Sequence, residues 1–220
     1  MQDTWRAVDE YYAAALLPPD EALTNALQES DSAGLPQIAV SPLQGAFLEL
    51  FARSVRARSV LEIGTLGGYS TIRLARGVGP SGRVLTLEYQ PAHADVARRN
   101  IAAAGLSDRV EIRVGAALDL LPQLEGSDRV PFDLVFLDAD KENNAAYLDR
   151  AVRLGRPGTV IIVDNVVRDG TVVDAQNPSG AVQGTRAMVD MLRTDDRLDA
   201  TAIQTVGVKG YDGFVYALVR

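Results

Sequence analysis

The sequence predicts an α/β protein built on one doubly wound, mostly parallel sheet that ends in an antiparallel hairpin. Five short runs rich in Val, Ile and Leu follow one another from residue 59, and a helix-length segment separates each run from the next, as is typical of βαβ units. Two further apolar runs near the C-terminus are joined by a short turn that contains glycine, which indicates a hairpin. The chain has 220 residues and is 47% hydrophobic, which is enough for the core of one such domain.

Ahead of the sheet, residues 1–57 are predicted to form helices that pack against it. Trp5, Val8 and Tyr12 recur at helical spacing and predict a first helix. The sequence PPDE at 18–21 is typical of a helix start and predicts a second helix. We therefore expect two N-terminal helices whose apolar faces lie against the larger part of the protein.

A third helix is predicted just before the sheet. Ser41 followed by Gln44 is the pattern of a capping box, and Pro42 stands at the first helical position, where proline is preferred. The apolar residues that follow at helical spacing are expected to form one buried face: Leu43, Phe47, Leu50 and Phe51.

The five parallel strands are predicted, in chain order, at SVLEI, RVLTLE, RVEIRV, FDLVFLD and TVIIVDN. After them, residues 168–180 are rich in Asp, Asn, Pro and Gly and predict a loop. A helix around Met188 and the hairpin strands TAIQTV and FVYALVR complete the chain. No linker is visible, so we expect one domain over 1–220, with helices in 1–57 and the α/β core in 58–220.

Composition excludes several classes of protein. The formal net charge of -7 and the lack of a basic stripe argue against a nucleic-acid partner. The chain has no cysteine, so it has neither disulfides nor a thiolate metal site, which fits the cytoplasm. The acidic, aromatic N-terminus does not resemble a signal peptide, and no apolar run approaches the roughly 20 residues of a membrane helix. We expect a soluble, cytoplasmic protein with no membrane segment.

A glycine-rich segment, LEIGTLGGYST at 61–71, follows the first predicted strand. Its glycines allow the backbone to turn tightly and to approach a ligand, and Ser70 or Thr71 could cap the next helix. Leu66 stands where a dinucleotide-binding fingerprint needs its second glycine, and no P-loop lysine follows. The segment therefore predicts either a simple strand-to-helix turn or a ligand loop at the carboxyl edge of the sheet.

Glu88 favours the ligand loop. It ends the second run, 24 residues after Gly64, where an acidic side chain can accept hydrogen bonds from both hydroxyls of a ribose. A single Glu at a strand end is usually just solvated, but together with the glycine segment it predicts a nucleoside ligand.

Charged and amide side chains end the fourth and fifth runs: Asp138, Asp140 and Lys141 on one, Asp164 and Asn165 on the other. These two strands should be neighbours, so Asp138 and Asp164 can converge on one ion. Carboxylate and amide oxygens are hard ligands that suit Mg²⁺, Mn²⁺ or Ca²⁺. Helix capping is the simpler interpretation, but Asp164 with Asn165 would be a redundant cap, which favours ligation.

The segments VLEIGTLGGYST, Glu88, LDADK and VIIVDN together closely resemble the cation-dependent small-molecule O-methyltransferases, the family of the catechol and caffeoyl-coenzyme A O-methyltransferases. The resemblance runs from about Ile38 to the C-terminus, and DADK combined with DN is far more specific than the glycine segment. It implies a class I methyltransferase fold with a Rossmann-like sheet of seven strands. It further implies S-adenosylmethionine as methyl donor, a divalent cation with Mg²⁺ foremost, a small phenolic acceptor and a homodimer.

The resemblance also implies roles for the residues that match the family's motifs. The donor would contact Val40, Glu62, Gly64, Thr65, Gly68, Ser70, Glu88, Gly115, Ala116, Ala117, Asp138 and Asp140. The metal ligands would be Asp138, Asp164 and Asn165, and the catalytic residues Lys141 and Asp138. The acceptor would lie against Lys141, Asn165, Tyr147 and Arg168.

A metal beside a lysine suits methyl transfer to a phenol. A phenol with a pKa near 10 is mostly protonated at pH 7 and is then a poor nucleophile. A divalent cation about 4 Å away, at an effective dielectric of about 20, favours the phenolate by roughly 8 kcal/mol before desolvation is subtracted. Lys141 would act on the same oxygen as general base or as electrostatic partner. Chelation of two neighbouring hydroxyls would orient one of them, so the expected acceptor is a vicinal diphenol.

The expected acceptor pocket departs from the plant enzymes of that family. Asn144 stands where they carry a second tyrosine, and Val167 and Arg168 stand where they often carry Leu-Trp. These changes argue against a hydroxycinnamoyl-coenzyme A acceptor and leave a catechol-like molecule. Arg168 would favour an acidic acceptor, although a solvated loop arginine is the simpler interpretation.

Other residues and other functions are given less weight. His93, on a predicted helix after Glu88, is expected at the surface and not as a base, and Trp5, Tyr11 and Tyr12 are expected in core packing or a dimer interface. Two alternatives stay open: a nucleotide-binding oxidoreductase, against which Leu66 argues, and a noncatalytic donor-binding module. Such a module would be expected to lose the lysine or a metal ligand, and none is missing here. The DADK segment and the acidic charge argue against a nucleic-acid methyltransferase.

Overall fold

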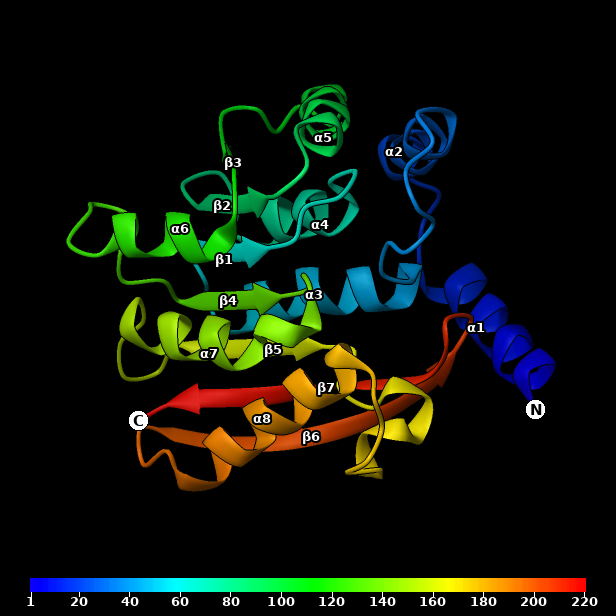
Figure 1. Ribbon diagram of the computed structural model, residues 1–220. Helices are drawn as coiled ribbons and strands as arrows, with labels where there is room; N and C mark the ends of the chain where they lie inside the picture. Colours follow the sequence, from blue (N-terminus) through cyan, green and yellow to red (C-terminus); the bar gives the residue numbers. More distant parts are fainter.

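The computed structural model describes residues 1–220 and contains one seven-stranded sheet with helices on both faces (Figure 1). The strand order is β3-β2-β1-β4-β5-β7-β6. The strands are β1 (Ser59–Ile63), β2 (Arg83–Glu88), β3 (Val110–Val114), β4 (Leu134–Leu137), β5 (Val160–Asp164), β6 (Leu198–Gly207) and β7 (Gly210–Val219). Strands β1 to β5 pair in parallel, whereas β7 is antiparallel to both β5 and β6. The predicted doubly wound sheet with its C-terminal hairpin is confirmed.

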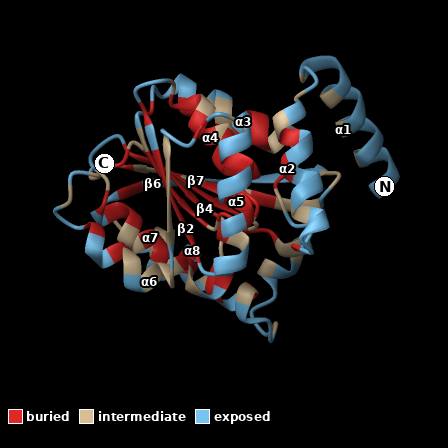
Figure 2. Cartoon of the chain, turned by 90° about the horizontal axis from the view of Figure 1, so that it is seen from above, coloured by how far each residue is buried: buried red, intermediate tan, exposed pale blue.

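The helices form two layers around the sheet (Figure 2). They are α1 (Gln2–Leu16), α2 (Glu21–Ser32), α3 (Pro42–Ser54), α4 (Tyr69–Gly77), α5 (Pro91–Ala103), α6 (Ala117–Leu120), α7 (Asn144–Arg153) and α8 (Gly180–Thr194), with short 3-10 turns η1 (Leu121–Leu124), η2 (Lys141–Asn143) and η3 (Arg168–Val173). Alternate strand residues feed two cores, so that Val60 packs with α2 to α5 and Leu61 packs with α6 to α8. None of these helices is long and apolar enough to cross a membrane.

Helix α1 does not pack as the sequence predicts. None of its side chains is buried, and Val8, Tyr11 and Tyr12 are exposed. The helix lies instead beside the tip of the β6–β7 hairpin, where the Asp9 Oδ2 atom accepts a hydrogen bond from the Val208 amide at 2.7 Å. Its apolar spacing therefore predicted the helix correctly but not its burial.

Helix α3 buries a different face from the predicted one. Leu50 is 59% exposed, whereas the side chains that enter the core are Ala46, Leu48 and Ala52. The reason is the close approach of α4: a Cβ atom on Gly77 would lie 2.8 Å from the Ala52 Cβ atom. Only a small side chain such as Ala52 fits this contact, so Leu48 enters the core beside it, Leu50 turns to solvent, and Phe47 packs on Phe214 of β7 with ring centroids 5.5 Å apart.

Candidate active site

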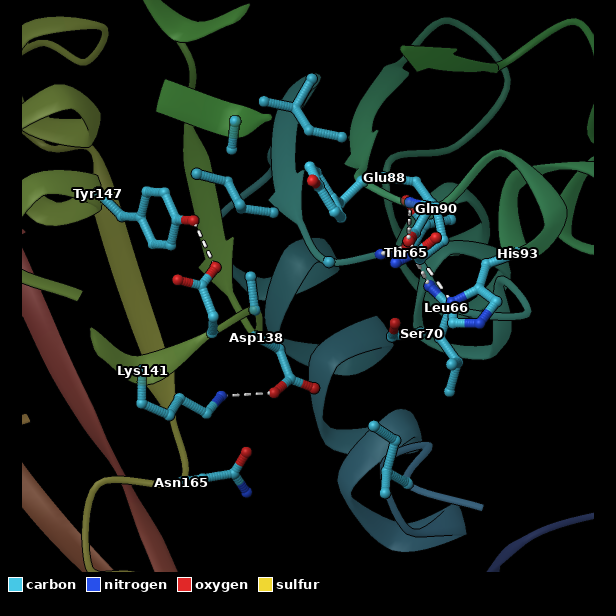
Figure 3. Close-up of a pocket in the computed structure, with 18 of the residues that line it drawn as sticks. Thr65, Leu66, Ser70, Glu88, Gln90, His93, Asp138, Lys141, Tyr147 and Asn165 are labelled. Carbon is cyan, nitrogen blue, oxygen red and sulfur yellow. Dashed lines mark hydrogen bonds and ion pairs between the residues drawn. The ribbon is translucent and has the colours of Figure 1, made fainter. Parts of the chain in front are cut away.

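A cavity of about 910 Å³ opens beyond the carboxyl ends of β1, β2 and β4, where the chain direction splits (Figure 3). Most predicted site residues line it: Val40, Gly64, Thr65, Ser70, Glu88, Gly115, Ala116, Ala117, Asp138, Asp140, Lys141, Tyr147, Asn165 and Arg168. Glu62 and Gly68 are outside its wall. Asp164 lines an adjoining cavity of about 320 Å³ that also contains Asp138 and Asn165, so the two cavities meet at the predicted metal ligands.

The loop between β1 and α4 passes against the end of β4. A Cβ atom on Gly64 would lie 2.3 Å from the Asp138 carbonyl oxygen, and the φ of Gly64 is +98°, so this position requires glycine. Gly68, not Ser70 or Thr71, is the N-cap of α4, which corrects the predicted cap. The Ser70 and Thr71 hydroxyls instead donate hydrogen bonds to the two carboxylate oxygens of Glu62, at 2.6 and 2.5 Å.

Glu62 is therefore enclosed by its own chain. It is fully buried on the central strand β1, and burial raises its pKa to about 7 in spite of the hydrogen bonds from Ser70 and Thr71, which lower it. Ser70 lines the cavity, and its hydroxyl connects the cavity wall to Glu62 behind it. Glu62 thus fixes the loop from behind the wall of the cavity.

Glu88, at the end of β2, holds together the loop that follows β1 and the loop that follows β2 (Figure 3). Its Oε2 atom accepts hydrogen bonds from the Thr65 and Leu66 amides at 3.1 and 2.8 Å, and its Oε1 atom accepts one from the Gln90 amide at 2.9 Å. His93 was expected at the surface, but its side chain lines the cavity and its Nδ1 atom lies 3.5 Å from the Glu88 Oε1 atom. The sequence did not indicate this, because the first turn of α5 folds back over Glu88.

Asp138 and Asp164 end two adjacent parallel strands, as predicted. The Asp138 Oδ1 atom accepts a hydrogen bond from the Lys141 Nζ atom at 2.8 Å. The Asp164 Oδ1 atom accepts one from the Asn165 amide at 2.9 Å, and the Oδ2 atom accepts one from the Gln44 Nε2 atom at 2.7 Å. The two carboxylates thus line one cavity, and the Lys141 ammonium group is the only cation paired with either of them.

The chemistry of these donors fits a divalent cation. Burial, and then the negative charge of Asp138, raise the pKa of Asp164, which means that the pair lacks positive charge. Asn165 adds an amide oxygen beside them, and its φ of +57° places it in the wall of the cavity. A cation held by these three side chains alone would keep coordination positions free for other oxygens.

Lys141 is held in place from two sides. It is only 8% exposed, and its ammonium group is paired with Asp138. From the other side, a Cβ atom on Gly184 of α8 would lie 2.3 Å from the Lys141 carbonyl oxygen, so the helix packs directly on the lysine backbone. A lysine fixed in this way presents one charge at one point of the cavity.

Asp140 and Tyr147 form a separate pair in the same wall. The Tyr147 hydroxyl donates a hydrogen bond to the Asp140 Oδ1 atom at 2.6 Å. Burial and this carboxylate raise the pKa of Tyr147 well above its ordinary value, so the phenol stays protonated at neutral pH and is not a base. Tyr147 therefore serves as a hydrogen-bond donor that orients Asp140.

The loop after β5 is held in an unusual backbone conformation. Asn165, Arg168 and Asp169 all have positive φ, at 57°, 55° and 54°. The Asp212 Oδ1 atom, on β7, accepts hydrogen bonds from the Val167, Arg168 and Gly213 amides at 3.0 to 3.1 Å. The predicted loop therefore begins with the turn η3, which the hairpin fixes against the cavity.

Sequence reasoning missed two residues of this region, Gln44 and Asp212. The Ser41 hydroxyl accepts the Gln44 amide, as in a capping box, but the Gln44 side chain reaches Asp164 instead of returning to Ser41. The capping pattern already explained Gln44 locally, so nothing in the sequence indicated its contact with Asp164. Asp212 lies in a turn-like sequence and carried no signal.

Comparison with known proteins gives similarities that span nearly the whole chain. The profile of a family described as O-methyltransferase matches residues 17–216. A catechol O-methyltransferase of Mycobacterium tuberculosis is 58% identical over 97% of this chain and 95% of that protein. A catechol O-methyltransferase of Niastella koreensis is 49% identical over 98% of both.

Solved structures agree with these sequence similarities. The O-methyltransferase from Bacillus cereus, in complex with SAH, is 54% identical and superposes with a TM-score of 0.98 over 100% of both chains. An O-methyltransferase from Streptomyces achromogenes involved in tomaymycin synthesis, in complex with SAM, is 48% identical with a TM-score of 0.96, over 99% of this chain and 98% of that one. The likeness therefore includes every strand that carries the cavity.

Proposed function

Because this chain belongs to the O-methyltransferase family and is an S-adenosylmethionine-dependent enzyme of it, we propose that it methylates one hydroxyl of a vicinal diphenol in a reaction that requires a divalent cation. The observation that carries the proposal is the convergence of Asp138, Lys141 and Asn165 at one end of the cavity, with Asp164 directly behind them. Relatives named catechol O-methyltransferases support the same acceptor class.

The residues present suit each requirement of the transfer. The acceptor oxygen gives up its proton and bonds to the methyl carbon, while the carbon–sulfur bond breaks and its electron pair stays on sulfur. Asp138, Asp164 and Asn165 would hold the cation, Mg²⁺ foremost, which when bound supplies positive charge that lowers the cost of ionising the acceptor. Lys141 adds a second positive charge at the same place, and its pairing with Asp138 keeps its Nζ atom directed into the cavity.

The donor would occupy the other end of the cavity. Glu88 and the small residues Gly115 and Ala116 line that end, and the glycine loop that Glu62 fixes forms its floor. A rigid floor holds the methyl group in one position relative to Lys141 and Asn165, which is how positioning accelerates a transfer between two bound molecules.

The test is methylation of a panel of catechols by the purified protein, with S-adenosylmethionine, before and after removal of metal by EDTA. Mono-methylated product should form, should disappear with EDTA and should return when Mg²⁺ is added in excess. Asp164→Ala should lower the rate by more than about 100-fold, because loss of a ligand costs more than loss of a residue that orients one. The exposed Asp190→Ala on α8 is the matched control. Activity that survives EDTA, or that survives in Asp164→Ala, would contradict the metal requirement.

The homodimer and the cytoplasmic location stay predictions. Gel filtration and cell fractionation would test them.

A further inference from the structure

Two positive charges at the cavity have no partner. Arg168, on the loop after β5, and Lys209, at the tip of the β6–β7 hairpin, both line the wall that contains Lys141 and Asn165. Neither forms an ion pair with any carboxylate of the chain. Lys141, in contrast, is paired with Asp138 at 2.8 Å. Lys141 thus has an ion-pair partner within the chain, and the two outer cations do not.

The nearest acidic side chains are already used. Asp212 accepts three backbone amides through its Oδ1 atom, and Asp9 accepts the Val208 amide through its Oδ2 atom. Asp169, next to Arg168 in sequence, is exposed and does not line the cavity. These carboxylates hold the loop and the hairpin in place, and although Asp9 and Asp212 line a cavity with Lys209, neither forms an ion pair with Arg168 or Lys209.

Arg168 is placed by a costly backbone conformation. Its φ is +55°, in the left-handed region that non-glycine residues seldom adopt, and the next residue shares this conformation. Strain of this kind persists only where the surrounding structure imposes it, here through the hydrogen bonds from the loop to Asp212. Arg168 is half-buried in the wall and is therefore not a freely solvated loop arginine.

Lys209 is exposed at the rim of the same cavity. Its Nζ atom donates a hydrogen bond to the Gln37 carbonyl oxygen at 3.1 Å, next to Pro36 and Ile38, which also line the cavity. A carbonyl oxygen orients the ammonium group but does not cancel its charge. The hairpin and the 36–40 segment, which lie side by side near α1 in Figure 1, thus meet at an uncompensated cation.

We propose that the acceptor is a vicinal diphenol that carries a carboxylate, and that Arg168 and Lys209 bind this carboxylate while Asn165 and Lys141 lie at its hydroxyls. The inference rests on the proposed function and narrows its acceptor class. An arginine matches a carboxylate with two parallel N–H donors, and a second cation nearby strengthens the contact. A diphenol with an amino group would instead meet two positive charges, so the same residues select against it.

The test compares three acceptors that differ only in charge: a catechol with a benzoic carboxylate, its neutral methyl ester, and the corresponding benzylamine. The carboxylate should have a kcat/KM about 10- to 100-fold above that of the ester, mainly through a lower KM, and the amine should be poorest. Arg168→Gln and Lys209→Gln should each bring the ratio of kcat/KM for the carboxylate to kcat/KM for the ester close to one. The double change Arg168→Glu with Lys209→Glu should reverse the order of carboxylate and amine.

Controls separate this inference from others. Arg53→Gln changes an exposed arginine of α3 that likewise has no carboxylate partner but lies outside the cavity, and it should alter nothing. Affinity for S-adenosylhomocysteine, measured by calorimetry, should be equal in all variants, and Arg168→Lys should restore part of the preference. If no diphenol is methylated, the proposed function fails. If all three are methylated alike, or if the glutamine variants lose affinity for S-adenosylhomocysteine, the carboxylate inference is wrong although the function stands.

Discussion

The two ends of the cavity differ in how their charges are balanced. At the donor end, Glu62 receives two hydroxyl hydrogen bonds and Glu88 receives three backbone amides, all from the chain itself. At the other end, Asp138 and Asp164 together have one ammonium group, and Arg168 and Lys209 have no carboxylate. Unbalanced charge on a buried or half-buried side chain, such as Asp164 or Arg168, is costly unless a ligand completes it, whereas Lys209 is exposed. The charges at the end proposed for the donor are thus balanced by the chain itself, whereas those at the end proposed for the acceptor are not.

The strongest way to break this contrast is to remove the one ammonium group that the chain pairs with the carboxylates of this end. Lys141→Met should lower kcat by about 10²- to 10⁴-fold, because the acceptor oxygen then loses the group that acts on it. Lys141→Arg keeps the positive charge but cannot accept a proton. If Lys141 acts as a fixed positive charge beside Asp138, with which it is paired at 2.8 Å, Lys141→Arg should retain at least about 10-fold more activity than Lys141→Met.

Affinity for S-adenosylhomocysteine is the control for Lys141, and it should be the same in both variants because the donor end is separate. If Lys141→Arg is as inactive as Lys141→Met while both bind S-adenosylhomocysteine normally, the fixed-charge role is wrong and lysine acts as a base.

The closed end can be tested through the pH dependence of stability. Burial raises the pKa of Glu62 from its ordinary 4.5 to about 7. The folded protein therefore favours the protonated acid, so the stability contributed by Glu62 is fully present below pH 4.5 and is lost as the pH rises through 7. In Glu62→Gln, the amide can still pair with Ser70 and Thr71 but does not titrate. As the pH rises from 4.5 to 8, the free energy of unfolding of Glu62→Gln should increase relative to that of the native protein by up to about 3 kcal/mol.

Urea unfolding without metal or donor measures this difference. The pKa of Asp164 is raised in both proteins, so its effect on stability cancels when one is subtracted from the other. If the stabilities of the native protein and Glu62→Gln vary with pH in the same way over this range, the pKa of Glu62 is not raised in the folded protein.

The sequence predicts the sheet and the positions of the site far better than it predicts the helix faces. Strands such as VIIVD are buried on both faces, so their composition alone identifies them, and their carboxyl ends must meet at one edge. The exposed face of α3 was mispredicted because size, not polarity, decided which residues could approach α4. The burial of α1 was mispredicted because apolar spacing does not say whether another element covers it.

Within the site, the sequence identifies residues that act through their own chemical type and misses those that act through a partner. Asp138 and Asn165 directly follow the adjacent strands β4 and β5, and Lys141 comes three residues after Asp138, so topology brings them together. His93 and Gln44 arrive from helices whose orientation depends on packing. Gln44 in particular lies 120 residues from Asp164 in sequence, and no local pattern can encode that contact.

Gln44 offers the test with the smallest expected effect. It is the only residue whose side-chain amide donates a hydrogen bond to Asp138 or Asp164. Its Nε2 atom lies 2.7 Å from the Asp164 Oδ2 atom, and Asp164 is only 4% exposed, so no water can readily replace it. Gln44→Leu removes the hydrogen bond at similar volume and leaves Asp164 held by the Asn165 amide alone. Affinity for Mn²⁺, measured by electron paramagnetic resonance, should fall by about 10- to 100-fold.

The matched control for Gln44 is Gln37→Leu. The Gln37 Nε2 atom also donates a hydrogen bond to an aspartate, Asp31, at 2.7 Å, but that pair is exposed and neither residue is a proposed metal ligand. If orientation of Asp164 is what Gln44 provides, only Gln44→Leu should lose Mn²⁺ affinity, and both variants should bind S-adenosylhomocysteine as the native protein does. Equal Mn²⁺ affinity in the two variants would mean that the strand alone orients Asp164. The Asp138 and Asp164 carboxylates would then not depend on Gln44 to bind a cation.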